Sequence, residues 1–421
     1  MKRKRIISMI LALMLAFALL PAATAADLPF SDVPDGAWYA SDVLNAYALK
    51  LINGKSLDKF APDDNMTYAE AVKLAACIHQ KDSFGKITLS NGDPWYQPYA
   101  DYAKQWGIIE EDPDWDAPAT RAGYMAIFAY ALNLKTEELN YVPEGSIPDV
   151  PITHPQAYEI YMMYRAGIVQ GVDASFKCSP DSNIKRSEVA AILTRMLDPD
   201  KRKTFDIPYP SEPDAPDFDY AAANAVNVFL ATGRLPDGRD IHYADAIAYD
   251  WYAVCDVDRD GKTELMFTIY NTSDPGEVIY AFDPATGEFK PEIEAIPDLT
   301  YYSNGIIVLF WPAGIGLEGY GFVPYDIYKY NKKADVYEYK TSIAMWDKTA
   351  AAKDLSGKPF PDDVDRDGNG AVYMFYIDGA WDGKYVDDDA TEERFSEYFP
   401  TVESMEDFIS VPWHELYQAR G

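Results

Sequence analysis

The feature that most constrains the fold is an internal repeat in the first half of the chain, with a period of about sixty residues. Each copy has an aromatic-rich amphipathic segment, at residues 38–54, 95–109 and 157–171, followed by a second apolar segment at helical spacing. Because one such unit cannot bury its apolar face alone, the three copies are expected to pack together. The sequence therefore predicts an all-α, three-repeat bundle.

The second segment of each copy predicts a longer helix, at residues 70–78, 123–134 and 188–197. Polar loops rich in Asp, Pro and Asn precede two of these helices. Thr67 stands three residues before Glu70, which is the capping-box pattern that opens a helix. Gly54 and Gly171 follow the first segments of copies one and three, where glycine readily takes the left-handed conformation.

Two short motifs resemble those of the S-layer homology repeat. Its opening is matched by Phe30-Ser31-Asp32-Val33 and Ile147-Pro148-Asp149-Val150. Its Thr-Arg-Ala-Glu signature is matched by Thr67-Tyr68-Ala69-Glu70, Thr120-Arg121-Ala122-Gly123 and Lys185-Arg186-Ser187-Glu188. The resemblance divides this region into repeat one (residues 28–84), repeat two (85–143) and repeat three (144–197).

This resemblance implies a pseudo-threefold bundle whose inter-repeat grooves bind a secondary cell-wall polysaccharide, often one carrying pyruvate ketals. The signature arginine would be the main contact, because guanidinium can donate two parallel hydrogen bonds to a carboxylate. The signature glutamate would cap its helix, and packing is the favoured role for the tryptophans, with stacking on sugar as the alternative. The implied binding residues are Asp32, Trp38, Gly54, Glu70, Trp95, Arg121, Asp149, Gly171, Arg186 and Glu188.

Four positions depart from the family pattern. They are Tyr68 in place of the first arginine, Glu111 in place of the second glycine, Gly123 in place of the second glutamate, and Pro155 at the third tryptophan position. We therefore expect one or two working grooves, centred on Arg186 and then Arg121. The alternative for these arginines is a solvated helix N-terminus, where a cation is slightly unfavourable with the helix dipole.

The N-terminus predicts a secretory signal peptide at residues 1–25. Lys2 to Arg5 are basic, residues 6–20 are apolar, and Ala23-Thr24-Ala25 is a small-x-small cleavage signature. The alternative is an uncleaved anchor, but the apolar run is too short to span a membrane and no second run follows. The mature chain is expected to begin near Ala26.

Composition fits a protein that works outside the cell. Removing the four signal-peptide cations from a formal charge of −31 leaves −35, which disfavours nucleic acid and anionic membranes as partners. Only three cysteines occur, Cys77, Cys178 and Cys255, and they are widely spaced; this low usage fits export from a Gram-positive-type bacterium. A Cys77–Cys178 bridge is the alternative to three free thiols.

Prolines in residues 198–217 predict a semi-rigid linker to a different domain at residues 218–421. That domain is expected to be a mainly antiparallel β (α+β) fold, a meander flanked by helices at residues 218–231 and 404–418. The predicted strands cover residues 251–255, 265–270, 278–282, 305–310, 325–330, 336–340 and 372–377.

An acidic loop after the first of these strands predicts a calcium site. Alternate carboxylates converge when the chain curls, and Gly261 permits the sharp turn. The expected ligands are Asp256, Asp258, Asp260 and Glu264, with the carbonyl of Lys262. The loop resembles the calcium-binding hairpins of FG-GAP-type surface domains; it is not an EF-hand, because position twelve holds Phe267 and the flanks are strands. An acidic turn without metal is the alternative.

A second loop repeats the pattern with Asp363, Asp365 and Asp367, but has Ala371 where the first has Glu264, so it predicts a weaker site. The run at residues 387–389 is expected to be a solvated loop.

Recognisable catalytic signals are missing. The four histidines show no metal-ligand spacing, and no Gly-x-Ser-x-Gly elbow occurs. We therefore expect a protein anchored non-covalently to the cell wall that displays a calcium-stabilised C-terminal binding domain. The alternative is a wall-anchored extracellular enzyme that acts on polysaccharide.

Overall fold

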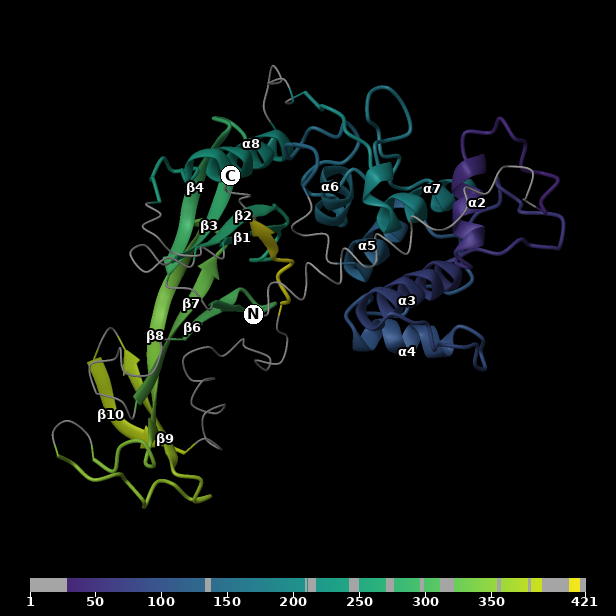
Figure 1. Cartoon of the computed structure of the whole chain (residues 1–421). Coiled ribbons are helices and arrows are strands. Elements are labelled where there is room, and N and C mark those ends of the chain that lie inside the picture. Colours follow the sequence, from purple (N-terminus) through teal and green to yellow (C-terminus); the bar gives the residue numbers. More distant parts are fainter. Residues whose placement is uncertain are drawn as a thin grey trace, which may run out of the picture. The chain divides into compact units, whose positions relative to one another are not determined.

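The computed structural model describes residues 29–132, 138–208, 210, 217–241, 250–269, 276–295, 299–310, 322–353, 357–377, 380–387 and 409–416 (Figure 1). The predicted signal peptide lies outside these residues. The chain divides into two compact units. Unit 1 is Met1–Val142, Ser146–Val150 and His154–Tyr209, and unit 2 is Pro143–Gly145, Pro151–Thr153 and Pro210–Gly421. Within the described residues, no helix has the length and apolar character needed to cross a membrane.

Unit 1 is helical, with a short and a long helix in each repeat. The short helices are α2 (Ala40–Ala48), α4 (Gln97–Gln105) and α6 (Ala157–Arg165), and the long ones are α3 (Tyr68–Phe84), α5 (Arg121–Ala131) and α7 (Arg186–Leu197). The three predicted long helices are confirmed, each beginning two residues earlier than expected. The capping box is also confirmed, since the Thr67 hydroxyl accepts from the Glu70 amide and the Glu70 carboxylate accepts from the Thr67 amide.

A closed ring of backbone hydrogen bonds joins the segments that precede the long helices. The amide of Met66 donates to the Ile184 carbonyl (3.1 Å), that of Ile184 to Ala119 (3.0 Å), and that of Ala119 to Met66 (2.7 Å). A second ring, two residues further along, joins Tyr68 to Ala117, Arg121 to Ser182, and Arg186 to Asp64. One segment from each repeat therefore occupies an equivalent position around a common centre, and the N-termini of α3, α5 and α7 converge there.

The core of unit 1 is continuous across its helices. Phe60, Tyr124 and Phe128 are completely buried in it. Part of the expected linker also belongs to this core, because Ile207 is only 3 % exposed and the Phe205 ring lies 5.5 Å from that of Phe176. Residues 205–207 are thus part of the core of unit 1, although they were predicted to belong to a semi-rigid linker.

Unit 2 contains one helix and two antiparallel sheets. Helix α8 (Phe218–Thr232) confirms the prediction for residues 218–231, and its Phe229 packs against Phe267 at 5.1 Å. The first sheet has the order β11-β1-β2-β3-β4, formed by His414–Leu416, Asp250–Cys255, Glu264–Ile269, Gly276–Asp283 and Glu288–Ala295. The second has the order β10-β9-β8-β7-β6-β5, formed by Ala380–Val386, Ala371–Ile377, Val336–Asp347, Phe322–Asn331, Ile306–Phe310 and Leu299–Tyr301.

The predicted strands are present, but the sequence analysis missed four others. Strand β4 escaped notice because it is charged and contains Pro291, which an edge strand tolerates. Strands β5, β10 and β11 were also not expected. The predicted closing helix at residues 404–418 is wrong where the structure describes it, since β11 pairs antiparallel with β1. Pairing with the open edge of β1 satisfies backbone groups that a helix would have bonded internally.

Candidate functional site

The two signature arginines are buried, which excludes a solvated helix N-terminus. Arg121 and Arg186 stand at the first positions of α5 and α7, and each is 5 % exposed. The guanidinium of Arg186 donates to the carbonyls of Phe60 (3.0 Å) and Asn53 (2.6 Å), and lies 4.8 Å from the Phe60 ring. Burial lowers the pKa of Arg186, while the charge of Glu70 opposes this effect.

Arg121 joins repeats two and three. Its Nε donates to the Cys178 carbonyl at 2.7 Å, and its Nη1 forms an ion pair with Oε1 of Glu188 at 2.5 Å. The other carboxylate oxygen of Glu188 accepts from the Lys185 amide at 2.9 Å, which caps α7. The signature arginine of one repeat is thus paired with the signature glutamate of the next.

This pairing defines what we name the Arg121 groove, a cavity of about 330 Å³. Its lining comprises Trp38, Arg121, Val169, Gln170, Gly171, Val172, Glu188, Ala191, Ile192 and Arg195. Trp38 is 64 % exposed, so the expectation that it is packed away is wrong. Gly171 has φ +87°, and a Cβ there would lie 2.7 Å from the Phe176 backbone, so only glycine fits. The groove combines the arginine of repeat two, the glutamate and glycine of repeat three, and the tryptophan of repeat one.

The signature residues equivalent to those of the Arg121 groove are also present for Arg186, and we name this set the Arg186 groove. The arginine comes from repeat three, and Gly54 and Glu70 from repeat one. Trp95 of repeat two is 37 % exposed, with the ammonium of Lys73 5.4 Å from its ring. The backbone at Gly54 approaches Ser56 and Lys59 closely, and a Cβ would overlap them.

The remaining interface, which we name the Tyr68 junction, collects the departures from the family pattern. Tyr68 stands at the arginine position of repeat one, and its hydroxyl occupies the space that a Cβ on Gly123 would fill. The relation that places Trp38 and Gly171 beside Arg121 assigns Pro155 and Glu111 to this same junction. Two of the four departures, Tyr68 and Gly123, are thus in contact at one interface, and repeat equivalence assigns the other two to it.

Asp32 and Asp149 hold loops in place. The two oxygens of Asp32 accept from the amides of Phe60 (2.8 Å) and Ala61 (2.9 Å). Asp149 accepts in the same way from Cys178 and Ser179, both at 2.8 Å. Burial by itself would raise the pKa of Asp32, but the backbone hydrogen bonds lower it below its usual value. These aspartates therefore position the loops whose carbonyls bind the two arginines.

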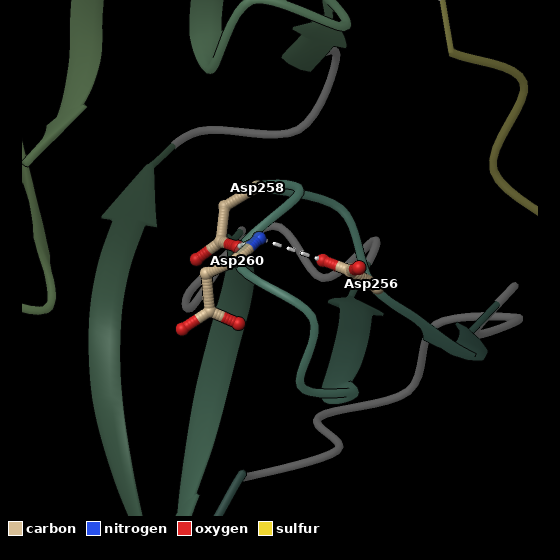
Figure 2. Close-up of side chains that lie close together, drawn as sticks. All are labelled: Asp256, Asp258 and Asp260. Atoms are coloured by element: carbon tan, nitrogen blue, oxygen red, sulfur yellow. Dashed lines mark hydrogen bonds between the residues drawn. The ribbon is translucent and has the colours of Figure 1, made fainter. Parts of the chain in front are cut away.

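The loop between β1 and β2 brings three predicted metal ligands together. One carboxylate oxygen each of Asp256, Asp258 and Asp260 lies within 4.8 Å of the others (Figure 2). The Asp260 amide donates to Asp256 at 3.1 Å, the bond drawn in Figure 2, and to Asp258 at 2.8 Å. Asp258 is only 1 % exposed, and its Oδ2 has no hydrogen-bond partner among the described residues. Gly261 makes the turn with φ +94°.

The side chains of two further loop residues, Glu264 and Lys262, make other contacts. Glu264 accepts from the Val257 amide at 2.9 Å and lies outside the group of three oxygens. The ammonium of Lys262 bridges Asp260 and Asp335. Burial, followed by the charge of Asp258, raises the pKa of Glu264 to about 9 and that of Glu292 in β4 to about 8. The sequence analysis did not find Glu292 and Asp335, because they come from elements distant along the chain.

The second acidic loop is assembled differently from its prediction. Asp365 and Asp367 approach Asp387, while Asp363 is outside this group. Asp387 is 1 % exposed and accepts from the amide (2.9 Å) and Nε (3.3 Å) of Arg366, so the expectation of a solvated residue is wrong for it. The arginine already supplies positive charge at this position. The three cysteines are free, so the Cys77–Cys178 bridge is absent.

Comparison with known proteins finds similarity to one class of protein. Residues 29–72 and 146–190 match the model of the S-layer homology domain. Over 206 residues the chain is 26% identical to "Cell surface protein" of Thermoanaerobacter kivui, covering 49% of this chain and 20% of that protein. Over 114 residues it is 25% identical to "Surface-layer 125 kDa protein" of Lysinibacillus sphaericus, covering 24% of this chain and 10% of that protein.

In its repeat region the chain is therefore similar to S-layer homology domain proteins of the cell surface. The chain spans a fifth or less of the length of these two relatives. The family matches lie in repeats one and three, while the structure places a segment of repeat two as the third member of the central rings.

Proposed function

We propose that unit 1 attaches the chain non-covalently to a Gram-positive-type cell wall by binding an anionic secondary polysaccharide. The observation that carries this proposal is the Arg121 groove, in which a buried arginine–glutamate pair and an exposed tryptophan line one cavity. Guanidinium groups bind carboxylate and phosphate oxygens, and an exposed indole offers an apolar face to a sugar ring. The Arg186 groove, with the equivalent signature residues, would supply a second site.

The test is co-sedimentation of the full mature chain with purified Gram-positive walls, before and after hydrofluoric acid extraction of their secondary polymer. Binding is expected only to walls that retain the polymer. Trp38→Ala should weaken it, because the variant removes an exposed groove surface without disturbing the core. Trp106→Ala is the matched control, since Trp106 is 46 % exposed at the end of α4 and does not line the groove. Equal binding to extracted walls would refute the proposal.

A specific observation also favours a calcium-stabilised display domain in unit 2. The unpaired Oδ2 of Asp258 is buried beside carboxylate oxygens of Asp256 and Asp260, a costly arrangement that a hard cation would relieve. Calcium takes six to eight oxygen ligands, and these three aspartates would supply part of such a shell.

This second proposal is tested by thermal unfolding of the full chain with calcium and with a chelator. Calcium that binds only the folded state raises its stability by mass action. The transition of unit 2 should therefore move up with calcium, and Asp258→Asn should remove the shift. Asp283→Asn is the control, because Asp283 is in β3 and pairs with Lys290 at 2.6 Å, outside the group of three. A wild-type transition that ignores calcium would refute the site.

A further inference from the structure

We propose that Arg195 is the residue of the Arg121 groove that binds the oxyanion of the ligand, and that Arg121 chiefly builds the groove. This inference rests on the proposed function of unit 1. It assigns the ligand a carboxylate or phosphate group held on a sugar at the rim of the cavity.

The charge of Arg121 is already compensated. Its Nη1 contacts Glu188 at 2.5 Å and its Nε donates to the Cys178 carbonyl. Its side chain is 6 % exposed, against 24 % for that of Glu188. An incoming anion would therefore approach a buried, near-neutral pair and would compete with a carboxylate that belongs to the protein.

Arg195 brings a second guanidinium to the same cavity. It lies in α7 seven residues after Glu188, which is two helical turns along the same face. Its Nη1 donates to the Ile168 carbonyl at 2.9 Å, a bond that orients the planar group without neutralising it. Arg195 is half-buried, so its charge is partly desolvated and acts strongly on a ligand in the cavity.

The nearby counter-charge of Arg195 is Asp42 of α2. Burial lowers the pKa of Arg195, and the charge of Asp42 raises it against this effect. Burial raises the pKa of Asp42, although Thr194 and the charge of Arg195 act in the opposite direction. Burial thus disfavours the ionised form of this counter-charge. Glu188 is in direct contact with Arg121, whereas among the described residues no ion pair joins Asp42 to Arg195.

This cation is specific to one groove. The positions equivalent to Arg195, nine residues after the first residue of each long helix, hold Cys77 in α3 and Tyr130 in α5. The Arg186 groove has instead Lys73 over Trp95, with Lys55 3.2 Å from Glu70. The two grooves therefore present different cations in different places.

The cavity and its rim limit what binds. A volume of about 330 Å³ is at the small end of ligand pockets, which span about 300–1,000 Å³. Such a space suits one charged sugar group rather than a length of polymer. Trp38 would stack on that sugar while Arg195 binds its oxyanion.

The experiment measures binding of the full mature chain to polymer released from Gram-positive walls, by titration calorimetry. Wild type should show two sites for each chain. Arg195→Gln should weaken one of them by at least about tenfold, because charge-assisted hydrogen bonds to the anion are lost. Arg195→Lys, which keeps the charge but loses the planar fork, should fall between. Lys104→Gln is the charge-matched control, since Lys104 in α4 pairs with Asp112 and lies outside the groove lining.

The chemical identity of the oxyanion is determined with polymer whose carboxylates have been amidated with carbodiimide. Loss of the Arg195-dependent site on the amidated polymer assigns a carboxylate, and retention there with loss after phosphate cleavage assigns a phosphate. Unfolding temperatures of all variants are measured alongside; if Arg195→Gln is destabilised, the comparison of Arg195→Lys with wild type decides. Wild-type binding that neither Arg195 variant weakens would overturn this inference but leave the proposed function standing. A wild-type chain that binds no polymer would overturn the proposed function itself.

Discussion

The hydroxyl of Tyr68 lies where a side chain at position 123 would begin, so the residues at these two positions depend on each other. Tyr68 also lies 3.3 Å from the Thr120 hydroxyl, which caps α5. At the interface of repeats two and three, Arg121 at the first position of α5 is paired with Glu188 at the third position of α7. At the interface of repeats three and one, Arg186 donates to backbone carbonyls, and Glu70 acts on it through its charge. At the Tyr68 junction a tyrosine and a glycine replace the arginine and the glutamate together, and the interface remains packed.

The effect of Gly123→Ala is expected to change sign with the residue at position 68. In wild type the added methyl overlaps Tyr68 and should cost about 1–3 kcal/mol. In a Tyr68→Ala background the overlap is gone, and alanine should be favoured over glycine in the helix by up to about 1 kcal/mol. The free energy of unfolding of each variant is measured by hydrogen exchange of the α5 amides at increasing urea concentration, in the wild-type and in the Tyr68→Ala background. Additive effects of the two substitutions would contradict the dependence.

Arg186→Ala is expected to destabilise unit 1 as well as reduce wall binding. The variant leaves the carbonyls of Phe60 and Asn53 without the arginine's donors; the buried carbonyl of Phe60 should cost about 1–3 kcal/mol, and that of the exposed Asn53 less. Trp38→Ala should reduce binding with little change in stability. Urea unfolding beside wall co-sedimentation separates the two effects. An Arg186→Ala chain as stable as wild type would show that the contacts to the two loops contribute little.

Asp32 is expected to make the stability of unit 1 depend on acid pH. The pKa of Asp32 is lower in the folded state than its ordinary value. Its contribution to the free energy of unfolding is therefore present above about pH 4 and is lost as the pH falls through the pKa of the folded state. Asp32→Asn should be less stable than wild type at pH 6, and the difference should shrink at pH 3. Urea midpoints across this range provide the measurement, with the exposed Asp35→Asn as control. A stability difference between wild type and Asp32→Asn that is the same at pH 6 and pH 3 would contradict this prediction.

Unit 2 is expected to lose stability as the pH rises when calcium is absent. Glu264 and Glu292 have folded pKa values raised to about 9 and about 8, while an unfolded glutamate titrates near about 4.3. Between these values the folded state holds more protons than the unfolded state, so rising pH favours unfolding. Unfolding temperatures in chelator should fall from pH 5 to pH 9, and Glu292→Gln should flatten the curve. A temperature independent of pH in wild type would contradict the assignment.

Local sequence patterns correctly predicted the helices and strands that are specified by residues close together in the chain. The capping box at Thr67 and Glu70 and the apolar spacing of α3, α5 and α7 identified the long helices, because these interactions are local. Alternation and turn residues identified most strands of unit 2 for the same reason. Strand β11 was missed because its pairing partner β1 is more than 150 residues away in the chain, and pairing across sequence overrides weak helical preference.

The sequence by itself determined the repeats, the family signatures, and the acidic loop at residues 256–260. Only the tertiary structure decided which repeats share an interface: it places Arg121 against Glu188, gathers the departures at the Tyr68 junction, and exposes Trp38 beside Arg195. It also brought Asp387 to a loop some twenty residues earlier in the chain. The physical reason is that a motif contains residues of one repeat only, whereas a groove is formed by side chains of three repeats. The hydrogen-bond rings and the shared core bring these side chains together.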